Sequence, residues 1–347
     1  MKKMSQNATY QDIANYTGFS KTTISRFFNR PETVTPENRE KIQHALEVLN
    51  YKGNKVARIL ANGKTEFIGL IIPNMYLSFY GEVIDRFLKS HDRYGYKFLV
   101  FSGSGDEESE RRYIGELLSY HVEGLVVLSH TIPSYELASY RIPVVAIERE
   151  DLYISSVNTD NRAGGALAAR HLCDRGCDLL IHINKADDDP HIPAQDRIDG
   201  FCSVCEELQV CHKVLTYKGE TSYADLEEKI IPIIDRIIDT WPDHRKGIFC
   251  SSDSIANITL NHLFHQFGEL PDDFRIIGFD GSPIANQAVM PLTTVQQQID
   301  LIVDNAMELL IEQIQAIKDT ETDRPVTLRP QPQHRIIPPL LRHGATT

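Results

Sequence analysis

From about residue 67 onwards the chain alternates short apolar runs with longer amphipathic segments, and this alternation restricts its fold more than any other feature. The runs that predict strands are FIGLIIP (67–73), YKFLVF (96–101), GLVVL (124–128), PVVAI (143–147), LLIHI (179–183), GIFC (247–250) and FRIIGF (274–279). The segments that predict helices between several of them are 80–94, 107–119, 161–175 and 255–267. Strands that alternate with helices form parallel sheets with helices on both faces. Because such a long stretch exceeds what one sheet needs, residues 66–347 are predicted to form two doubly wound α/β lobes, with ligands bound in the loops that follow the strands.

The first 52 residues have a different pattern, which predicts a small all-helical domain. Thr9 is placed to cap a first helix with Asp12 at its third position, and Gly18 permits the turn that follows. Ser20 then caps a second helix, whose outer face carries Lys21, Thr22, Ser25 and Arg26. Short helices joined by a glycine turn present side chains to the major groove in helix-turn-helix proteins. This domain is therefore predicted to bind DNA.

A third helix and a separate connecting region follow. Thr35-Pro36-Glu37 has the threonine cap, first-turn proline and acidic residue of a helix start, and this helix completes the small domain. Residues 53–65 then form a hinge region, in which NKVARILAN (54–62) could fold into about two helical turns without a partner for its apolar side. The segment is either a helix that forms only when another surface supports it, or a plain linker.

The charges of the chain are divided unevenly between these regions. The formal net charge is -12, but the first 65 residues hold 11 Lys and Arg against 5 Asp and Glu, a net charge of +6. The remaining residues hold 25 basic and 43 acidic side chains, a net charge of -18. A basic head on an acidic body confines the attraction for phosphate to the head.

Other features exclude several classes of protein. No apolar run approaches the roughly 18 residues of a membrane span. The N-terminus MKKMSQNATYQ lacks the apolar segment of a secretory signal, so a cytoplasmic protein is expected. Cys202 and Cys205 have CxxC spacing within a helical apolar pattern, and we interpret them as small buried side chains rather than metal ligands. No metal and no cofactor are predicted.

Several segments, in this order, resemble the lactose-repressor (LacI/GalR) family of bacterial transcription regulators. They are DIANYTGFSKTTISRFFN, VTPENREKI, LNYKGNKVARILANGKT, IGLIIPN, VEGLVVL, VNTDNRAGG, QDRIDGF, CSSD, IIGFD, MPLTTVQQ and RHGATT. The resemblance implies a helix-turn-helix head, a hinge helix and a periplasmic-binding-protein-like core. It also implies a homodimeric repressor of carbohydrate genes that leaves a palindromic operator when a sugar-like effector binds between the lobes.

The resemblance also implies which residues contact DNA. Lys21, Thr22 and Arg26 fall at the positions that meet base edges. The positions nearer the phosphates are Ser20, Thr23, Ser25, Asn29 and Thr33. In the hinge region the implied DNA-binding residues are Asn54, Val56, Ala57 and Leu60. Leu60 lies where the family inserts a leucine from each hinge helix into the minor groove, and this wedge requires a dimer.

For the effector, Asp160, Arg197 and Asp280 match the family's binding positions, and two carboxylates with a guanidinium suit a polyol. Phe79 and Tyr80 are candidates to stack on a sugar, and Asp253 and Gln297 also align with the cleft. Each residue has a structural alternative: Asp160 can cap a helix, Arg197 can form a surface salt bridge, and the aromatic pair can belong to the core. The acidic loop 184–195 leaves open whether Lys185 or His191 contacts the effector.

Other interpretations of the sequence remain. A corepressor, such as a purine or a partner protein, could replace the inducing sugar. A sugar-binding transport receptor shares the predicted core but needs neither a basic head nor DNA. An enzyme is not expected, because the chain has no full GxGxxG, GxxxxGK[ST] or GxSxG motif. No leucine heptads follow the core, so a dimer is expected rather than a tetramer.

Overall fold

The computed structural model describes residues 8–51, 65–103, 106–149, 152–186, 192–219, 221–323 and 331–347. The chain separates into two compact units, residues 1–64 and residues 65–347, and each is considered by itself. The hinge segment 53–64 lies outside the described residues, so its conditional helix stays a prediction.

The first unit is a bundle of short helices whose ends are set by their capping residues. Its elements are α1 (Tyr10–Thr17), α2 (Lys21–Asn29), the 3₁₀ turn η1 (Pro31–Thr33) and α3 (Pro36–Val48). The Thr9 backbone amide donates to Asp12 over 2.8 Å, and the Asp12 amide donates back to Thr9 over 3.3 Å, which forms the predicted capping box. Gly18 adopts the left-handed conformation that ends α1, with φ of 75°. The predicted caps and turn are confirmed.

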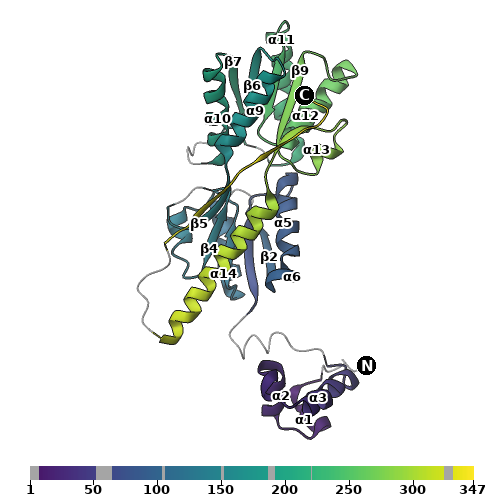
Figure 1. The fold of residues 1–347 in the computed structure, drawn as a ribbon, viewed down its shortest axis with the longest axis vertical. Coiled ribbons are helices and arrows are strands. Elements are labelled where there is room, and N and C mark those ends of the chain that lie inside the picture. The colour runs from purple at the N-terminus through teal and green to yellow at the C-terminus, as the bar shows by residue number, and fades with distance from the viewer. Residues whose placement is uncertain are drawn as a thin grey trace. The chain divides into compact units, whose positions relative to one another are not determined.

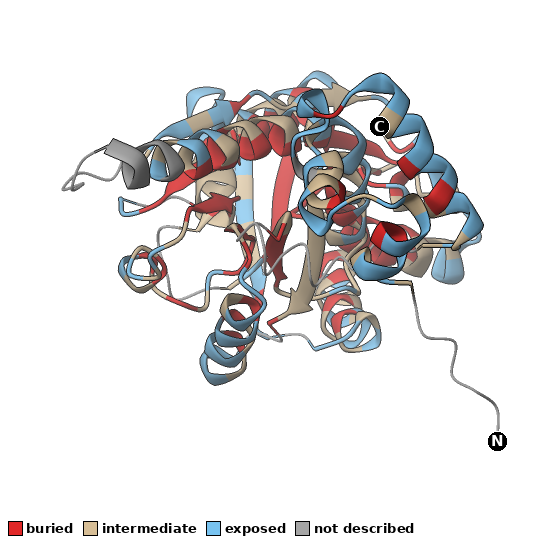
Figure 2. Cartoon of the chain, turned by 90° about the horizontal axis from the view of Figure 1, so that it is seen from below, coloured by how far each residue is buried: buried red, intermediate tan, exposed pale blue. Residues whose placement is uncertain are grey.

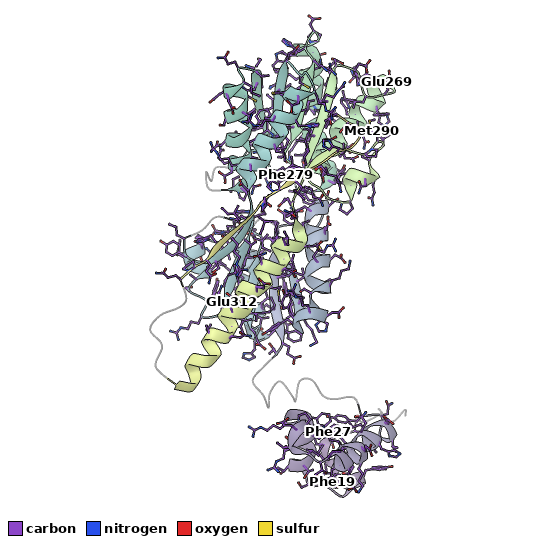
Figure 3. The ribbon with its side chains drawn as sticks, in the orientation of Figure 1. Phe19, Phe27, Glu269, Phe279, Met290 and Glu312 are labelled. Carbon is purple, nitrogen blue, oxygen red and sulfur yellow. The ribbon has the colours of Figure 1, made fainter. Side chains whose placement is uncertain are left out.

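The small core of this unit joins its three helices. Its buried residues are Ile13, Ala14, Ile24, Val34, Ile42 and Ala45. Aromatic side chains close the core, and the rings of Tyr10 and Phe28 are stacked with centroids 5.2 Å apart. Phe19 and Phe27 also pack against the core and are labelled among the side chains of this unit in Figure 3.

The second unit consists of two lobes, each built on a six-stranded sheet (Figure 1). In the first lobe all the strands are parallel, in the order β11-β5-β4-β3-β1-β2. These strands are β1 (Phe67–Ile72), β2 (Lys97–Ser102), β3 (Gly124–Val127), β4 (Val144–Ile147), β5 (Ser155–Thr159) and β11 (His334–Ile337). The helices of this lobe are α5 (Ser78–Lys89), α6 (His91–Tyr94), α7 (Glu107–Ser119), α8 (Ser134–Leu137) and α14 (Ile299–Asp323).

The second lobe repeats this architecture with one antiparallel edge strand. Its strand order is β12-β10-β9-β8-β6-β7, and β12 runs antiparallel to β10. The strands are β6 (Leu179–Lys185), β7 (Cys211–Tyr217), β8 (Lys246–Cys250), β9 (Phe274–Asp280), β10 (Thr293–Gln296) and β12 (Leu340–Arg342). The helices are α9 (Asn161–Asp174), α10 (Pro193–Glu207), α11 (Tyr223–Thr240), α12 (Asp253–Phe267) and α13 (Ile284–Gln287).

The described chain passes from one lobe to the other after β5, after β10 and after β11 (Figure 1). Figure 2 shows buried strands between helices whose outer faces are exposed, as expected for sheets covered on both sides. Among the described residues, no helix combines the length and the apolar character that a membrane span requires. The predicted pair of α/β lobes is confirmed.

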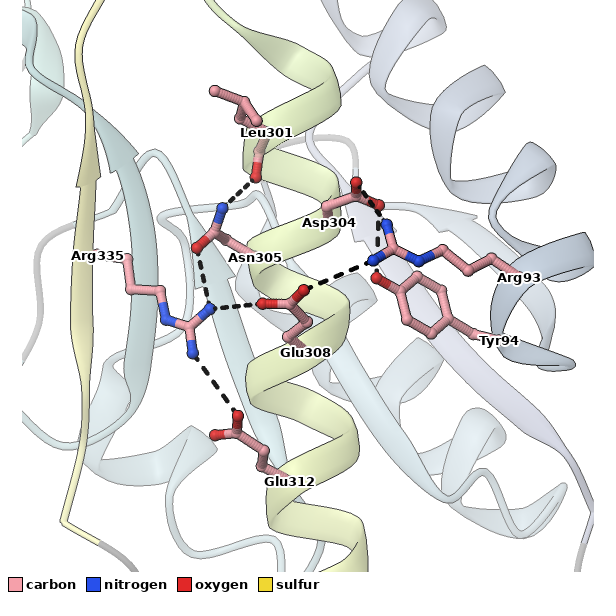
Figure 4. Close-up of polar contacts among 8 residues, drawn as sticks. All are labelled: Arg93, Tyr94, Leu301, Asp304, Asn305, Glu308, Glu312 and Arg335. Atoms are coloured by element: carbon pink, nitrogen blue, oxygen red, sulfur yellow. Dashed lines mark hydrogen bonds and ion pairs between the residues drawn. The ribbon is translucent and has the colours of Figure 1, made fainter.

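Helix α14 is fixed to the first lobe by an ordered row of ion pairs (Figure 4). Arg93 of α6 donates to Asp304 over 2.7 Å, and Arg335 of β11 donates to Glu308 over 3.1 Å. Glu308 also lies 3.8 Å from Arg93, and Glu312 lies 3.8 Å from Arg335. Acidic residues four positions apart share one helix face, so α14 meets arginines from both neighbouring elements. These ion pairs tie α14, which follows the crossing after β10, to β11, which precedes the last crossing to β12.

Several strands could not be recognised from their composition. Strand β5 has the sequence SSVNT, yet all five residues are buried between β4 and β11. Strands β7 and β12 lie at sheet edges and keep polar residues, so neither gives a continuous apolar run. The predicted helix 80–94 is two helices, because α5 ends at Lys89 and α6 at Tyr94.

Candidate functional site

A cavity of about 490 Å³ lies between the two lobes of the second unit. Its walls come mainly from residues at the carboxyl ends of strands and from the starts of α5 and α10. This is the predicted position for a ligand of parallel sheets. Of the predicted effector residues, Phe79, Tyr80, Arg197, Asp280 and Gln297 line this cavity.

Arg197 of α10 links the two lobes from within the cavity wall. Its Nε donates to the Asn161 side chain over 2.7 Å, and its Nη1 donates to the Ser251 carbonyl over 2.8 Å. Its Nη2 lies 3.6 Å from a carboxylate oxygen of Glu148 in the first lobe, and only 12% of its side chain is exposed. The guanidinium also lies 3.7 Å from the ring centre of Phe279. The alternative of a surface salt bridge is therefore wrong.

Phe279 supports this arrangement from the end of β9. Figure 3 places its label at the edge of the second lobe that faces the first lobe. A cation stacked on a buried aromatic ring is attracted by the negative face of the ring. The ring and the hydrogen bonds together hold the charge of Arg197 at one point of the cavity wall.

Glu148 is a site residue that the sequence analysis missed. One carboxylate oxygen accepts from the Thr159 amide over 2.5 Å, and the other accepts from the Asn161 side chain over 2.9 Å. Its backbone has a positive φ of 52°, which is uncommon for a residue other than glycine. The available signal was its position directly after the predicted strand 143–147, at a carboxyl end.

A second link between the lobes runs through Gln297. The Thr159 hydroxyl donates to the Gln297 carbonyl oxygen over 2.6 Å, and the Gln297 amide donates to Asp280 over 2.8 Å. Burial raises the pKa of Asp280, Arg197 opposes this effect, and the nearby Asp253 reinforces it. Thr159 belongs to the first lobe and Asp280 to the second, so this chain of hydrogen bonds joins the two lobes.

On the helical unit, the predicted base-contacting face of α2 is open to solvent. Lys21, Thr22 and Arg26 are exposed. Ser20 is also exposed, and its hydroxyl accepts from the Thr23 amide over 3.1 Å to cap the helix. The remaining phosphate-side candidates are the half-buried Thr23 and Ser25 and the exposed Thr33. The side chain of Asn29 lies outside the described residues, as do Asn54, Val56, Ala57 and Leu60.

Comparisons with known proteins agree with both the helical unit and the two-lobed unit. Residues 9–54 match the family model "Bacterial regulatory proteins, lacI family", and residues 169–338 match "Periplasmic binding protein-like domain". The chain is 32% identical to the ribose operon repressor of Halalkalibacterium halodurans over 308 residues, which are 88% of this chain and 90% of that protein. It is 31% identical to the sucrose operon repressor of Streptococcus mutans, over 91% of this chain and 95% of that protein.

The chain belongs to the LacI family of bacterial regulatory proteins. The fold agrees: the Lac repressor dimer bound to operator and the anti-inducer ONPF gives a TM-score of 0.80 over 98% of this chain and 99% of that one, at 20% identity. The predicted family and fold class are confirmed. This LacI-family chain is a DNA-binding transcriptional regulator and not an enzyme.

Two predicted effector residues of this LacI-family core do not line the cavity, which corrects the prediction. The carboxylate of Asp160 accepts from the Ala163 amide over 2.9 Å and caps α9. Asp253 is fully buried and accepts from the Ser282 amide over 2.7 Å and from the Thr294 hydroxyl over 2.6 Å. Asp160 thus caps a helix of the second lobe, and both carboxylate oxygens of Asp253 accept hydrogen bonds within that lobe.

The aromatic pair fits both of its interpretations. Phe79 is buried in the core of the first lobe and also lines the cavity, and its ring lies 5.3 Å from that of Tyr80 at an angle of 67°. Burial raises the pKa of the Tyr80 hydroxyl, so this group stays protonated. Lys185 also lines the cavity, whereas His191 lies outside the described residues.

None of the cysteines lines this cavity. Cys205 is buried in α10, and burial raises the pKa of its thiol to about 12, so it is not reactive. Cys202 is half-buried on the same helix. Within the described part of the chain, no group of three or more His, Cys, Asp or Glu side chains could hold a metal ion.

Proposed function

We propose that this LacI-family regulator is a cytoplasmic homodimeric repressor of carbohydrate-utilisation genes, released from a palindromic operator by a small sugar-like effector. The observation that carries the proposal is the cavity between the lobes, across which Arg197 contacts Glu148. The two relatives named above are repressors of a ribose operon and a sucrose operon, which supports a carbohydrate as the class of effector.

The operator is read by the exposed face of α2. Lys21 and Arg26 offer donors that can pair with guanine in the major groove, and Thr22 lies between them. The hydroxyl groups of Ser20, Thr23, Ser25 and Thr33, with Asn29, fix the domain against the phosphates. In the hinge region, Asn54, Val56, Ala57 and Leu60 enter the minor groove, with Leu60 as the wedge. Because the wedge needs its twofold mate, the regulator binds DNA as a dimer.

The effector binds between Arg197 and Asp280, with Glu148 as a further acceptor. Carboxylates accept hydrogen bonds from sugar hydroxyls, and Arg197 donates to ring or hydroxyl oxygens. Phe79 and Tyr80 supply an aromatic surface for an apolar sugar face, and Gln297 orients Asp280. Asp160 and Asp253 support the site indirectly, through α9 and through the loop at Ser282.

Two links cross the cavity, and both respond to its occupant. One joins Arg197 to Glu148, and the other joins Thr159 to Asp280 through Gln297. A ligand that inserts its own hydroxyls among these groups changes the relative free energy of the lobe arrangements. By thermodynamic linkage, an effector that lowers DNA affinity binds the DNA-free protein more tightly by the same factor.

The test is fluorescence anisotropy of the full-length protein with labelled DNA from upstream of its own gene and of neighbouring carbohydrate genes. We expect salt-dependent binding of a palindrome, reversed by one member of a sugar panel. Lys21→Ala and Arg26→Ala should each weaken specific binding by about 1–3 kcal/mol, whereas Lys41→Ala, on the exposed face of α3, serves as the matched control.

The outcomes separate the alternatives. A ligand that strengthens operator binding identifies a corepressor-dependent regulator and contradicts induction. A protein that binds sugar but shows no salt-dependent DNA binding is a solute receptor and contradicts the whole proposal. Leu60→Ala should weaken operator binding while leaving non-specific binding intact, and equal losses would contradict the wedge.

A further inference from the structure

A second, smaller cavity lies at the junction of the two lobes and has a volume of about 150 Å³. Its walls come from α5 of the first lobe, from Gly281 after β9, from Leu340 of β12, and from residues 296–301, which carry the chain from β10 into α14. Gln297 lines this cavity as well as the larger one. The smaller cavity is called the rear cavity below, and the larger one the main cavity.

The two cavities lie on different sides of α5. Tyr80 lines the main cavity, and Glu82, two residues later on the same helix, lines the rear cavity. Side chains two positions apart on an α-helix point about 200° apart around its axis. Because Gln297 lines both cavities, a rotation of the lobes about this crossing that widens one cavity narrows the other.

Two charged side chains from opposite lobes leave buried atoms unpaired at the rear cavity. Glu82 of α5 lines the cavity, and its Oε2 is buried. Arg342 of β12 donates through Nη1 to the carbonyl of the lining residue Gly281 over 3.3 Å, whereas its Nη2 is buried. Within the parts of the chain that the structure describes, neither Glu82 Oε2 nor Arg342 Nη2 has a hydrogen-bonding partner. Burial of a charged atom without a partner is unfavourable.

The neighbouring arginine does not relieve this situation. Arg86, one turn after Glu82, lies 3.8 Å from the other carboxylate oxygen of Glu82 and 3.1 Å from Asp300. Burial raises the pKa of the Glu82 carboxyl, and the positive charges of Arg86 and Arg342 act against this effect. Arg342 is therefore close enough to attract Glu82, although no ion pair joins the two side chains in this lobe arrangement.

We propose, building on the sugar-responsive function above, that Glu82 and Arg342 form a latch between the lobes, in which Arg342 Nη2 donates to Glu82 Oε2 in a second lobe arrangement with a closed rear cavity. In the structure the main cavity is bridged instead, by the contact between Arg197 and Glu148. The two pairs border different cavities and so favour different lobe arrangements. An effector that displaces Glu148 from Arg197 shifts the balance toward the arrangement that the latch stabilises.

The first experiment is zero-length cross-linking with a carbodiimide, which joins a carboxylate to an amine in contact with it. It is applied to full-length Arg342→Lys, because lysine keeps the positive charge and supplies the amine. Mass spectrometry should find an amide between Glu82 and position 342, and adding Glu82→Gln should remove it. The positive control is Arg170→Lys, since Arg170 contacts Glu207 over 2.6 Å within the second lobe. A cross-link at position 170 without one at position 342 overturns the latch.

The second experiment is a double-mutant cycle on operator affinity, measured by fluorescence anisotropy. Glu82→Gln and Arg342→Gln should each change the affinity in the same direction, by about three-fold or more, and the double variant should change it no further than the larger single change. Arg170→Gln and Glu207→Gln remove a pair that lies within one lobe and should leave the affinity unchanged. Additive changes, or no change, in the Glu82 and Arg342 variants overturn the latch.

The results separate the latch from the function on which it rests. A protein that a sugar releases from its operator, but whose Glu82 and Arg342 variants behave additively, keeps the proposed function and loses the latch. If the protein binds no DNA, the proposed function and the role of the latch in it are both overturned, even where the cross-link forms.

Discussion

Replacing Arg197 with lysine should strongly destabilise the core, although the charge is kept. A lysine ammonium is a point charge and cannot reproduce a flat guanidinium that reaches three partners and stacks on Phe279. At best it keeps one of these interactions. Asn161, the Ser251 carbonyl and Glu148 then compete for the single ammonium group of the lysine. Where the ammonium binds Asn161 or Ser251, Glu148 loses its counter-ion.

The magnitude follows from what is lost. One charged hydrogen bond contributes about 1.5–3 kcal/mol, and a desolvated cation on an aromatic ring contributes about 2 kcal/mol. Breaking a buried ion pair costs about 3–5 kcal/mol, which agrees with their sum. The predicted loss for Arg197→Lys is therefore roughly 3–5 kcal/mol. For a core of this size it corresponds to a fall in the melting temperature of roughly 10 °C.

Urea denaturation followed by the fluorescence of Trp241 is the appropriate assay. Trp241 is the only tryptophan of the chain and ends α11 in the second lobe, so its signal reports on the lobe that carries Arg197. The matched control is Arg170→Lys. Arg170 pairs with Glu207 over 2.6 Å at the surface, where the change should cost less than about 1 kcal/mol. Equal effects of the two substitutions would refute the structural role assigned to Arg197.

Two further predictions concern stability. Gly165→Ala places a methyl group 2.1 Å from the Arg197 carbonyl oxygen, so α9 and α10 must separate and urea midpoints should fall by the equivalent of about 1–3 kcal/mol. Gly115→Ala, in open space within α7, should instead raise stability by about 0.5–1 kcal/mol, and a fall there would contradict the reasoning. Burial lowers the pKa of His182 to about 3, below its ordinary value of 6.5. The unfolded chain then binds more protons between these values, so stability is complete above pH 6.5 and decreases as the pH falls, by up to about 1.4 kcal/mol per pH unit. His182→Phe should flatten urea midpoints measured between pH 7 and 5, and an unchanged slope would exclude this histidine as the cause.

The fold was predicted best where the signal is local. Thr9, Gly18 and Ser20 set helix ends through contacts with residues at most four positions away, and each occupies its predicted place. Buried parallel strands such as β1 and β3 are continuous apolar runs and were recognised for that reason. Strand β5 was missed, because its polar residues are buried by the return of β11 from the far end of the chain.

The sequence by itself determined the helical head, the alternation of strands and helices, and the family to which the chain belongs. Only the tertiary structure decided which side chains reach the cavity. Asp160 and Asn161 are neighbours in the chain, yet the first caps α9 and the second binds Arg197. The hydrogen bond between Thr159 and Gln297 joins residues that are far apart in the sequence. A local pattern of apolar and polar residues cannot predict such a contact. Cavity membership depends on how two sheets and their crossings come together, and this is a property of the folded chain.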